Sequence, residues 1–173
     1  MELPKQNRTQ TTSLLGKLLE KHLNPNKDPR IYVSKEVTFD YSTRHRIRVD
    51  YIQFKPENNT IGGIERGLFY CYEIKSCKED FNSGHGLNFI GDYNYIVFPS
   101  LEIYEECKNK IPHYVGVYII NEDSGYCDLK NIKKAKKVTR KYSVSEMLLM
   151  MFRSTNREIL KLSNKCGETY EKL

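Results

Sequence analysis

The run from Gly67 to Ser76 constrains the fold of this chain more than any other stretch. It reads Gly-Leu-Phe-Tyr-Cys-Tyr-Glu-Ile-Lys-Ser, an aromatic and β-branched sequence that is typical of a buried central strand. Near its carboxyl end it carries Glu73 and Lys75, whose side chains share a face because side chains alternate across a sheet. Burying such charges costs roughly several kcal/mol each unless they pair or hold an ion. Two interpretations fit this segment, a salt bridge and a functional site.

A further acidic residue lies in the preceding strand-like segments. Ile31–Tyr41 and Arg46–Pro56 have strand patterns and are joined by a polar turn around Ser42–His45, which predicts a β-hairpin. Asp50 lies in the middle of the second strand among apolar neighbours, a position that ordinary strands seldom give to a carboxylate. We therefore expect the Asp50 side chain to have a specific role.

A helix is expected before the hairpin, after a flexible N-terminus of residues 1–12. Thr12 or Ser13 can cap it, and its leucines recur at helical spacing between residues 14 and 23. The same spacing turns Glu20 away from the apolar stripe. We therefore expect Glu20 to face solvent.

Alternating helices and strands are also expected after the central strand. A partly helical crossover leads from Lys78 to a strand at Tyr93–Pro99, which would be parallel to the central strand. A short helix at Leu101–Asn109 and another buried strand at Tyr114–Asn121 follow. This order predicts an α/β protein with a mixed β-sheet flanked by α-helices.

A long C-terminal helix completes the expected fold. Ser143 and Glu146 form the Ser-x-x-Glu pattern of a capping box, so the helix is predicted over residues 143–165. Its expected core contacts are Leu148, Leu149, Phe152, Ile159 and Leu162.

Length and composition favour one folded domain. The 173 residues predict a single domain over 13–173, with its core at 31–129. No apolar run approaches the ~18 residues that span a bilayer, and Met1–Gln10 has no apolar signal segment, so we expect a cytoplasmic protein without a membrane partner. The five cysteines include no Cys-x-x-Cys pair, which favours reduced thiols.

The positive charge is concentrated in one stretch. The chain has a net charge of +6, and residues 128–141 hold seven basic side chains against Asp128 alone. The remainder is therefore net neutral. Such a concentration is typical of a surface that binds a polyanion such as nucleic acid, although a solvated loop explains it more simply.

Asp50, Glu73 and Lys75 together follow the order of an acid on one strand and Glu-x-Lys on the next. This order resembles the PD-(D/E)xK nuclease superfamily, which has the restriction-endonuclease-like fold. The resemblance is closest to the MmcB-like group linked to DNA repair, and it covers roughly Glu36–Asn121. Val49 stands where the superfamily name has proline. The matching segments are Arg48–Asp50, Tyr72–Ser76, Asp80–Phe81, and Asp92 ahead of the following strand.

The resemblance implies a DNA endonuclease that uses Mg²⁺ or Mn²⁺. Asp50, Glu73 and the backbone carbonyl of Ile74 would hold the metal, which prefers oxygen ligands. Lys75 would orient the attacking water and offset charge in the transition state. The alternative is a catalytically inactive module of the same fold that binds nucleic acid or a partner protein. DNA is the expected partner, with a homodimer or another protein as further options.

The resemblance also suggests Glu36, in the first hairpin strand, as an additional catalytic acid. Glu36 shares a face with Asp50 if the hairpin loop has an odd number of residues, and lies on the other face if the loop is Ser42–His45, because a one-residue shift exchanges the faces. His85 is a candidate DNA contact, although a surface position is the simpler account. The same choice applies to the other candidate DNA contacts, which are Arg44, Arg46, Arg48, Lys78, Lys133, Lys134, Lys136 and Lys137.

Overall fold

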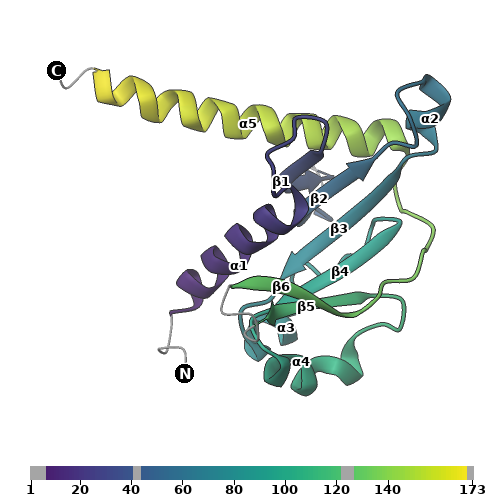
Figure 1. The fold of residues 1–173 in the computed structure, drawn as a ribbon, viewed down its shortest axis with the longest axis vertical. Coiled ribbons are helices and arrows are strands. Elements are labelled where there is room, and N and C mark those ends of the chain that lie inside the picture. The colour runs from purple at the N-terminus through teal and green to yellow at the C-terminus, as the bar shows by residue number, and fades with distance from the viewer. Residues whose placement is uncertain (1–6, 41–43, 122–126, 171–173) are drawn as a thin grey trace.

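The computed structural model describes residues 7–40, 44–121 and 127–170, with side chains up to residue 164. A six-stranded sheet with the spatial order β1-β2-β3-β4-β5-β6 forms its centre (Figure 1). β3, β4 and β5 are parallel to one another, whereas β1, β2 and β3 form an antiparallel series and β6 pairs antiparallel with β5. The strands are β1 (Tyr32–Phe39), β2 (Ile47–Lys55), β3 (Leu68–Ile74), β4 (Tyr93–Phe98), β5 (Gly116–Asn121) and β6 (Asp128–Lys133).

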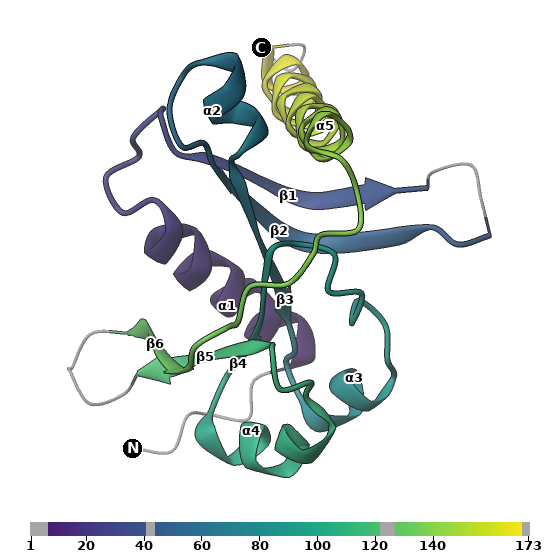
Figure 2. The ribbon, with the colours of Figure 1, turned by 90° about the vertical axis from the view of Figure 1, so that its right-hand side faces the viewer.

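Helices cover both faces of this mixed sheet, which confirms the predicted α/β class. The leucines of α1 pack with Tyr72, whereas Met147 and Met151 of α5 pack with Cys71, the next residue of β3. Since neighbouring strand residues point to opposite faces, α1 and α5 lie on opposite sides (Figure 2). The helices are α1 (Arg8–Leu23), α2 (Ile61–Glu65), α3 (Lys78–Asn82), α4 (Leu101–Cys107), the 3-10 turn η1 (Lys108–Lys110) and α5 (Val144–Tyr170).

The β1–β2 hairpin exchanges its two faces at the level of Asp50. On β2, Val49 and Ile52 both pack in the cluster under α5, although they are three positions apart and strict alternation would place them on opposite faces. The pairs Val37↔Val49 and Lys35↔Tyr51 keep one register, which sets Glu36 opposite Asp50. Glu36 itself has a φ of 52°, so the backbone is irregular at this level. Because of this irregularity, the side chain of Asp50 does not follow the ordinary alternation of faces along β2.

The first helix begins earlier than expected. α1 starts at Arg8 after Asn7, because the Gln10 side chain accepts a hydrogen bond of 3.2 Å from the Asn7 backbone. Residues 8–12 are therefore helical, and neither Thr12 nor Ser13 caps the helix. Glu20 is exposed, as predicted, yet it also accepts a hydrogen bond of 2.9 Å from the Tyr51 hydroxyl.

The C-terminal helix begins as predicted but packs differently. Ser143 Oγ accepts the Glu146 backbone N–H at 3.2 Å, which caps α5. Met147 and Met151 face the core and Leu148 is partly buried against it. The other expected core contacts are exposed because α5 has apolar residues on two sides and only one side meets the sheet; they are Leu149, Phe152, Ile159 and Leu162.

Cys71, Cys77, Cys107 and Cys127 carry free thiols. Within the described ranges, none of the helices combines the length and the apolar character that crossing a bilayer requires.

Candidate active site

Asp50 and Glu73 meet where β2 separates from β3. The β2–β3 ladder ends at the pair Tyr51↔Tyr72. Beyond it, the backbone N–H of Ile74 donates to Asp50 Oδ2 at 2.8 Å, so a carboxylate replaces the missing backbone acceptor. The N–H and C=O of one strand residue point to the same neighbour, and the Ile74 carbonyl therefore also faces the side of Asp50.

Glu73 is buried without a partner for one of its oxygens. Its exposed fraction is 5%, and Oε1 is the one buried side-chain polar atom without a hydrogen bond in the part of the chain that the structure describes. Burial raises the pKa of Glu73 well above its ordinary value, and the nearby charge of Asp50 raises it further. The positive charge of Lys75 opposes this rise without cancelling it. A cation beside the two carboxylates would oppose both causes, because its positive charge favours the ionised form of Glu73.

The loop between α3 and β4 closes over this pair of carboxylates. Gly86 has a φ of 79°, and a Cβ atom there would lie 2.5 Å from Glu73 Oε2. Lys75 is 4% exposed, and its ammonium group donates a hydrogen bond to the backbone carbonyl of His85. The loop thus positions both Glu73 and Lys75, and this loop geometry requires glycine at position 86.

These residues line a polar cleft of about 690 Å³. Three basic side chains, Arg8 of α1 with Arg46 and Arg48 of the hairpin, contribute to its wall. Arg8 also forms an ion pair of 2.6 Å with Asp80. The cleft therefore combines acidic groups at its base with cations at its edge, which suits a phosphate-containing ligand.

Glu36 is not brought into this cleft. Although the register sets it opposite Asp50, its carboxylate is half exposed and lies 4.0 Å from Arg157 and 3.8 Å from Lys161 on α5. Arg44 is exposed near the end of the hairpin, and Lys78 pairs with Glu106 at 3.3 Å.

The basic stretch lies at the other end of the central strand. The backbone N–H of Val138 donates to the Asp92 carbonyl, and Arg140 forms an ion pair of 3.0 Å with the Asp92 carboxylate, which also accepts the Phe69 N–H. Phe69 begins β3 whereas Glu73 lies near its end, about 13 Å away at strand spacing. The structure therefore does not bring Lys133, Lys134, Lys136 and Lys137 to the carboxylates; Lys137 lines a separate groove of about 1,300 Å³.

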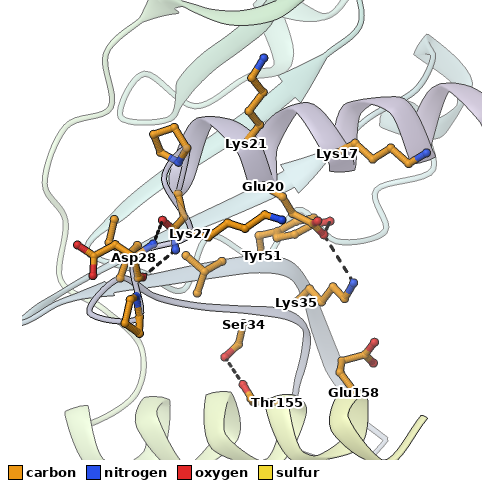
Figure 3. Close-up of a pocket in the computed structure, with 15 residues that line it drawn as sticks. Lys17, Glu20, Lys21, Lys27, Asp28, Ser34, Lys35, Tyr51, Thr155 and Glu158 are labelled. Carbon is orange, nitrogen blue, oxygen red and sulfur yellow. Dashed lines mark hydrogen bonds and ion pairs between the residues drawn. The ribbon is translucent and has the colours of Figure 1, made fainter. Parts of the chain in front are cut away.

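Another cavity of about 690 Å³ lies between α1, β1 and α5 (Figure 3). Its buried tyrosine, Tyr51, is hydrogen-bonded to Glu20, and Ser34 and Thr155 share a hydrogen bond of 2.9 Å across it. The lysines at its rim include Lys35, which lies 3.6 Å from Glu20. Its buried polar groups are thus satisfied, in contrast to Glu73.

Arg8 and Gly86 are two residues of the cleft that the sequence alone does not predict. Arg8 was assigned to the flexible N-terminus, and no local pattern connects it with Asp80, which is 72 residues away. Gly84 and Gly86 enclose His85, and this glycine pair is a signal for a special backbone conformation. It indicates a tight loop without indicating its contact with Glu73.

No family model, curated protein or solved structure matches this chain. Within residues 7–40, 44–121 and 127–170, no group of three or more histidine, cysteine or acidic side chains is arranged to hold a metal. Asp50 and Glu73 form a pair rather than such a group. Magnesium commonly takes one or two carboxylates and completes its shell with water and substrate oxygens, so this pair and the Ile74 carbonyl suit it. The unpartnered Glu73 oxygen fits the same assignment.

Proposed function

We propose that this protein is a metal-dependent DNA nuclease that hydrolyses phosphodiester bonds at the cleft of Asp50, Glu73 and Lys75. The observation that carries the proposal is the buried Glu73 oxygen, which has no partner and lies beside a second carboxylate. Holding a buried carboxylate beside a second one raises the free energy of the metal-free fold. A bound cation would offset this cost, so the pair is better explained as a cation site than as a structural contact.

Asp50, Glu73 and the Ile74 carbonyl would hold Mg²⁺ or Mn²⁺. The bound ion would polarise the scissile phosphate and lower the pKa of the attacking water. Asp50 would keep its hydrogen bond from Ile74, because a carboxylate has further lone pairs on its second oxygen. This bond fixes the orientation of the carboxylate and reduces the entropy lost on binding.

Lys75 would place its ammonium group beside the attacking water and the phosphate. The ammonium group has three N–H donors. One donates a hydrogen bond to the His85 carbonyl, which leaves two for substrate oxygens. Arg46 and Arg48 would bind neighbouring phosphates from the wall of the cleft. These roles give the cleft one group for positioning the nucleophile and two for positioning the DNA.

The test is incubation of the pure protein with supercoiled, linear and single-stranded DNA in Mg²⁺ or Mn²⁺. We expect cleavage that EDTA stops and that Asp50→Ala and Glu73→Ala each abolish. Glu57→Ala is the matched control, because Glu57 is an exposed acid paired with Arg66 outside the cleft. Cleavage that persists at the wild-type rate in Asp50→Ala would contradict the proposal.

A binding module without catalysis is the second candidate. The groove at the start of β3 favours it, because its basic residues Lys55, Arg66, Lys137, Arg140 and Lys141 lie apart from the carboxylates. Such a module would bind DNA without cleaving any of the substrates above. The affinity of such a module for DNA would be unchanged in Glu73→Ala. A nuclease would instead lose its cleavage activity in that variant.

A further inference from the structure

The groove at the start of β3 has more cations than its own acidic residues neutralise. Of these acids, Glu57 is paired with Arg66. The other, Asp92, is paired with Arg140. The remaining basic residues of the groove are exposed and form no ion pair within the residues that the structure describes; they are Lys55, Lys137 and Lys141. The groove of about 1,300 Å³ therefore carries a positive charge and suits an anionic partner.

The basic wall of this groove is a fixed segment of chain. Between β6 and α5, the Val138 N–H donates to the Asp92 carbonyl at 2.9 Å. The Lys141 N–H donates in the same way to the Ile90 carbonyl at 3.0 Å. In Figure 1 this segment passes the end of the sheet at which β3 and β4 begin. Its lysines project from a backbone that is already ordered, so a ligand that binds them does not have to order a free loop.

Two tyrosines of the groove have one ring face against another aromatic ring and the other face under a lysine. Tyr70 stacks on Tyr93 with the ring centroids 4.8 Å apart, and Lys55 Nζ lies 4.6 Å from the Tyr70 centroid. Tyr142 stacks at 4.6 Å on the phenylalanine that ends β1, and Lys141 Nζ lies 5.0 Å from the Tyr142 centroid. Since the stacked ring occupies one face, the ammonium group covers the other. Aromatic faces and cations thus alternate in the groove.

We propose that this groove binds a single-stranded polynucleotide, with phosphates on the lysines and bases against the rings of Tyr70 and Tyr142. Grooves that bind single strands combine cations along the backbone with aromatic rings for the bases. A lysine side chain is flexible, so its ammonium group can move from the ring face to a phosphate and leave that face to a base. The bases of a duplex are stacked on one another, and their faces are not available to the rings.

This binding surface is separate from the carboxylates of the cleft. The start of β3 and Glu73 are about 13 Å apart at strand spacing. The proposal therefore holds whether or not the cleft cleaves DNA, and its test uses no metal.

Fluorescence anisotropy in the presence of EDTA tests the proposal. The probes are oligothymidine, oligouridine and a DNA duplex, each of about 15 nucleotides or base pairs, since such grooves bind about 4–16 nucleotides. We expect the single strands to bind more tightly than the duplex, and the tighter of the two single strands identifies DNA or RNA as the partner. A duplex that binds as tightly as both single strands would overturn the proposal.

Substitution of the tyrosines tests the stacking. Tyr70→Leu and Tyr142→Leu should each weaken single-strand binding by about 5-fold to 100-fold and change duplex binding little. Tyr70→Phe keeps the ring and should bind like the wild type. Tyr104→Leu is the matched control, because Tyr104 is also half buried but lies on α4, outside the groove. Unchanged single-strand affinity in both leucine variants of the groove would overturn the proposal.

Substitution of the lysines tests the phosphate contacts. It changes exposed side chains only, so it remains decisive if a tyrosine variant fails to fold. Each phosphate contact of a single strand contributes about 0.7 to the slope of log K against log salt, so loss of the three groove lysines should lower the slope by about 1 to 2. The test variant combines Lys55→Gln, Lys137→Gln and Lys141→Gln.

The matched control for the lysines removes the same charge from the cavity of Figure 3. It combines Lys17→Gln, Lys21→Gln and Lys27→Gln, which are likewise exposed. This control should keep the wild-type slope for the single strands. Equal slopes in the two triple variants would overturn the proposal, because the binding would then depend on net charge and not on this groove.

Discussion

Gly86 and Glu73 lie so close together that a Cβ atom on Gly86 would be 2.5 Å from Glu73 Oε2. Such a distance is shorter than van der Waals contact, and Glu73 is 5% exposed, so its carboxylate has little room to move aside. The conformation of the loop and the position of the carboxylate therefore depend on each other.

The first prediction separates this contact from backbone strain. Gly86→Ala should displace Glu73 and lower metal-dependent cleavage by about 10²-fold or more, since a displacement of about 1 Å in an active site has that effect. Gly84→Ala is the matched control, because Gly84 also has a positive φ, 72°, but has open space for a Cβ. Single-turnover cleavage rates should fall in Gly86→Ala well below those of Gly84→Ala. Equal rates in the two variants would show that only strain matters.

The second prediction concerns pH and the stability of the metal-free protein. The pKa of Glu73 is raised in the folded state by burial and by Asp50, so between its ordinary pKa and the raised one the folded protein binds more protons than the unfolded chain. The free energy of unfolding therefore falls as pH rises through this window. Glu73→Gln removes this penalty, and its Tm should exceed the wild-type Tm by a few degrees at pH 8 and by less at pH 4.

Added metal should reverse the order of the two proteins. A ligand that binds only the folded state at a hundred times its Kd stabilises it by about 2.7 kcal/mol, so Mg²⁺ should raise the wild-type Tm and leave Glu73→Gln almost unchanged. Thermal unfolding with Mg²⁺ and with EDTA measures both effects. A wild-type Tm that does not respond to Mg²⁺ or Mn²⁺ would contradict the assigned metal ligands.

The third prediction distinguishes Lys75 from the metal ligands. Lys75→Met keeps much of the buried side chain but removes the ammonium group and its hydrogen bond to the His85 carbonyl. The variant should bind Mg²⁺, as followed by the metal-dependent Tm shift, and lose cleavage by about 10²-fold or more. If Lys75→Met loses the Tm shift to the same extent as Glu73→Gln, Lys75 has a part in metal binding instead.

The hairpin shows why the sequence predicts the acids but not the geometry of the site. Alternation identifies Asp50 as an acid among apolar residues, and the same alternation was expected to decide the face of Glu36. The strand changes faces at Asp50, and Glu36 adopts a φ of 52°. Such irregularities depend on tertiary packing, so a two-residue period cannot reveal them.

The C-terminal helix also shows that local sequence patterns do not reveal how an element packs. Helical periodicity and the cap at Ser143 predict where α5 begins, and the structure confirms this start. Leu149 and Met151 are both apolar, yet Met151 is 5% exposed and Leu149 49%. Which apolar side meets the sheet depends on the partner surface, and a helix with two apolar sides gives no local signal for the choice.

The fourth prediction concerns Asp92, which the resemblance placed among the motif residues. It is 4% exposed, accepts the Phe69 N–H at 2.9 Å and pairs with Arg140 at 3.0 Å. Arg140→Ala would leave a buried carboxylate without its cation, which costs about 3–5 kcal/mol. Urea unfolding should show this loss, whereas cleavage per folded molecule should be unchanged. A fall in the cleavage rate of the folded variant would instead link Asp92 and Arg140 to the cleft.

The last prediction concerns the two groups of basic residues. Lys134, Lys136 and Lys137 are exposed, whereas Lys133 is half buried and donates to the Pro112 carbonyl. Each lysine that contacts a phosphate contributes about 0.9 to the slope of log K against log salt. Changing the three exposed lysines to glutamine should therefore lower this slope by about one to three, and Lys133→Gln alone should change it little.

Cleavage at saturating DNA then separates the lysines from the arginines of the cleft. The start of β3, which the lysine stretch passes, is about 13 Å from Glu73, so the lysine variant should bind more weakly but keep its maximal rate. The double variant Arg46→Gln, Arg48→Gln should lower both the affinity for DNA and the maximal rate. These arginines line the cleft and would hold phosphates beside the scissile bond. Binding isotherms at several salt concentrations and single-turnover rates measure the two effects. An unchanged slope and affinity in the lysine variant would mean that this stretch is a solvated surface and that DNA reaches the carboxylates past the hairpin.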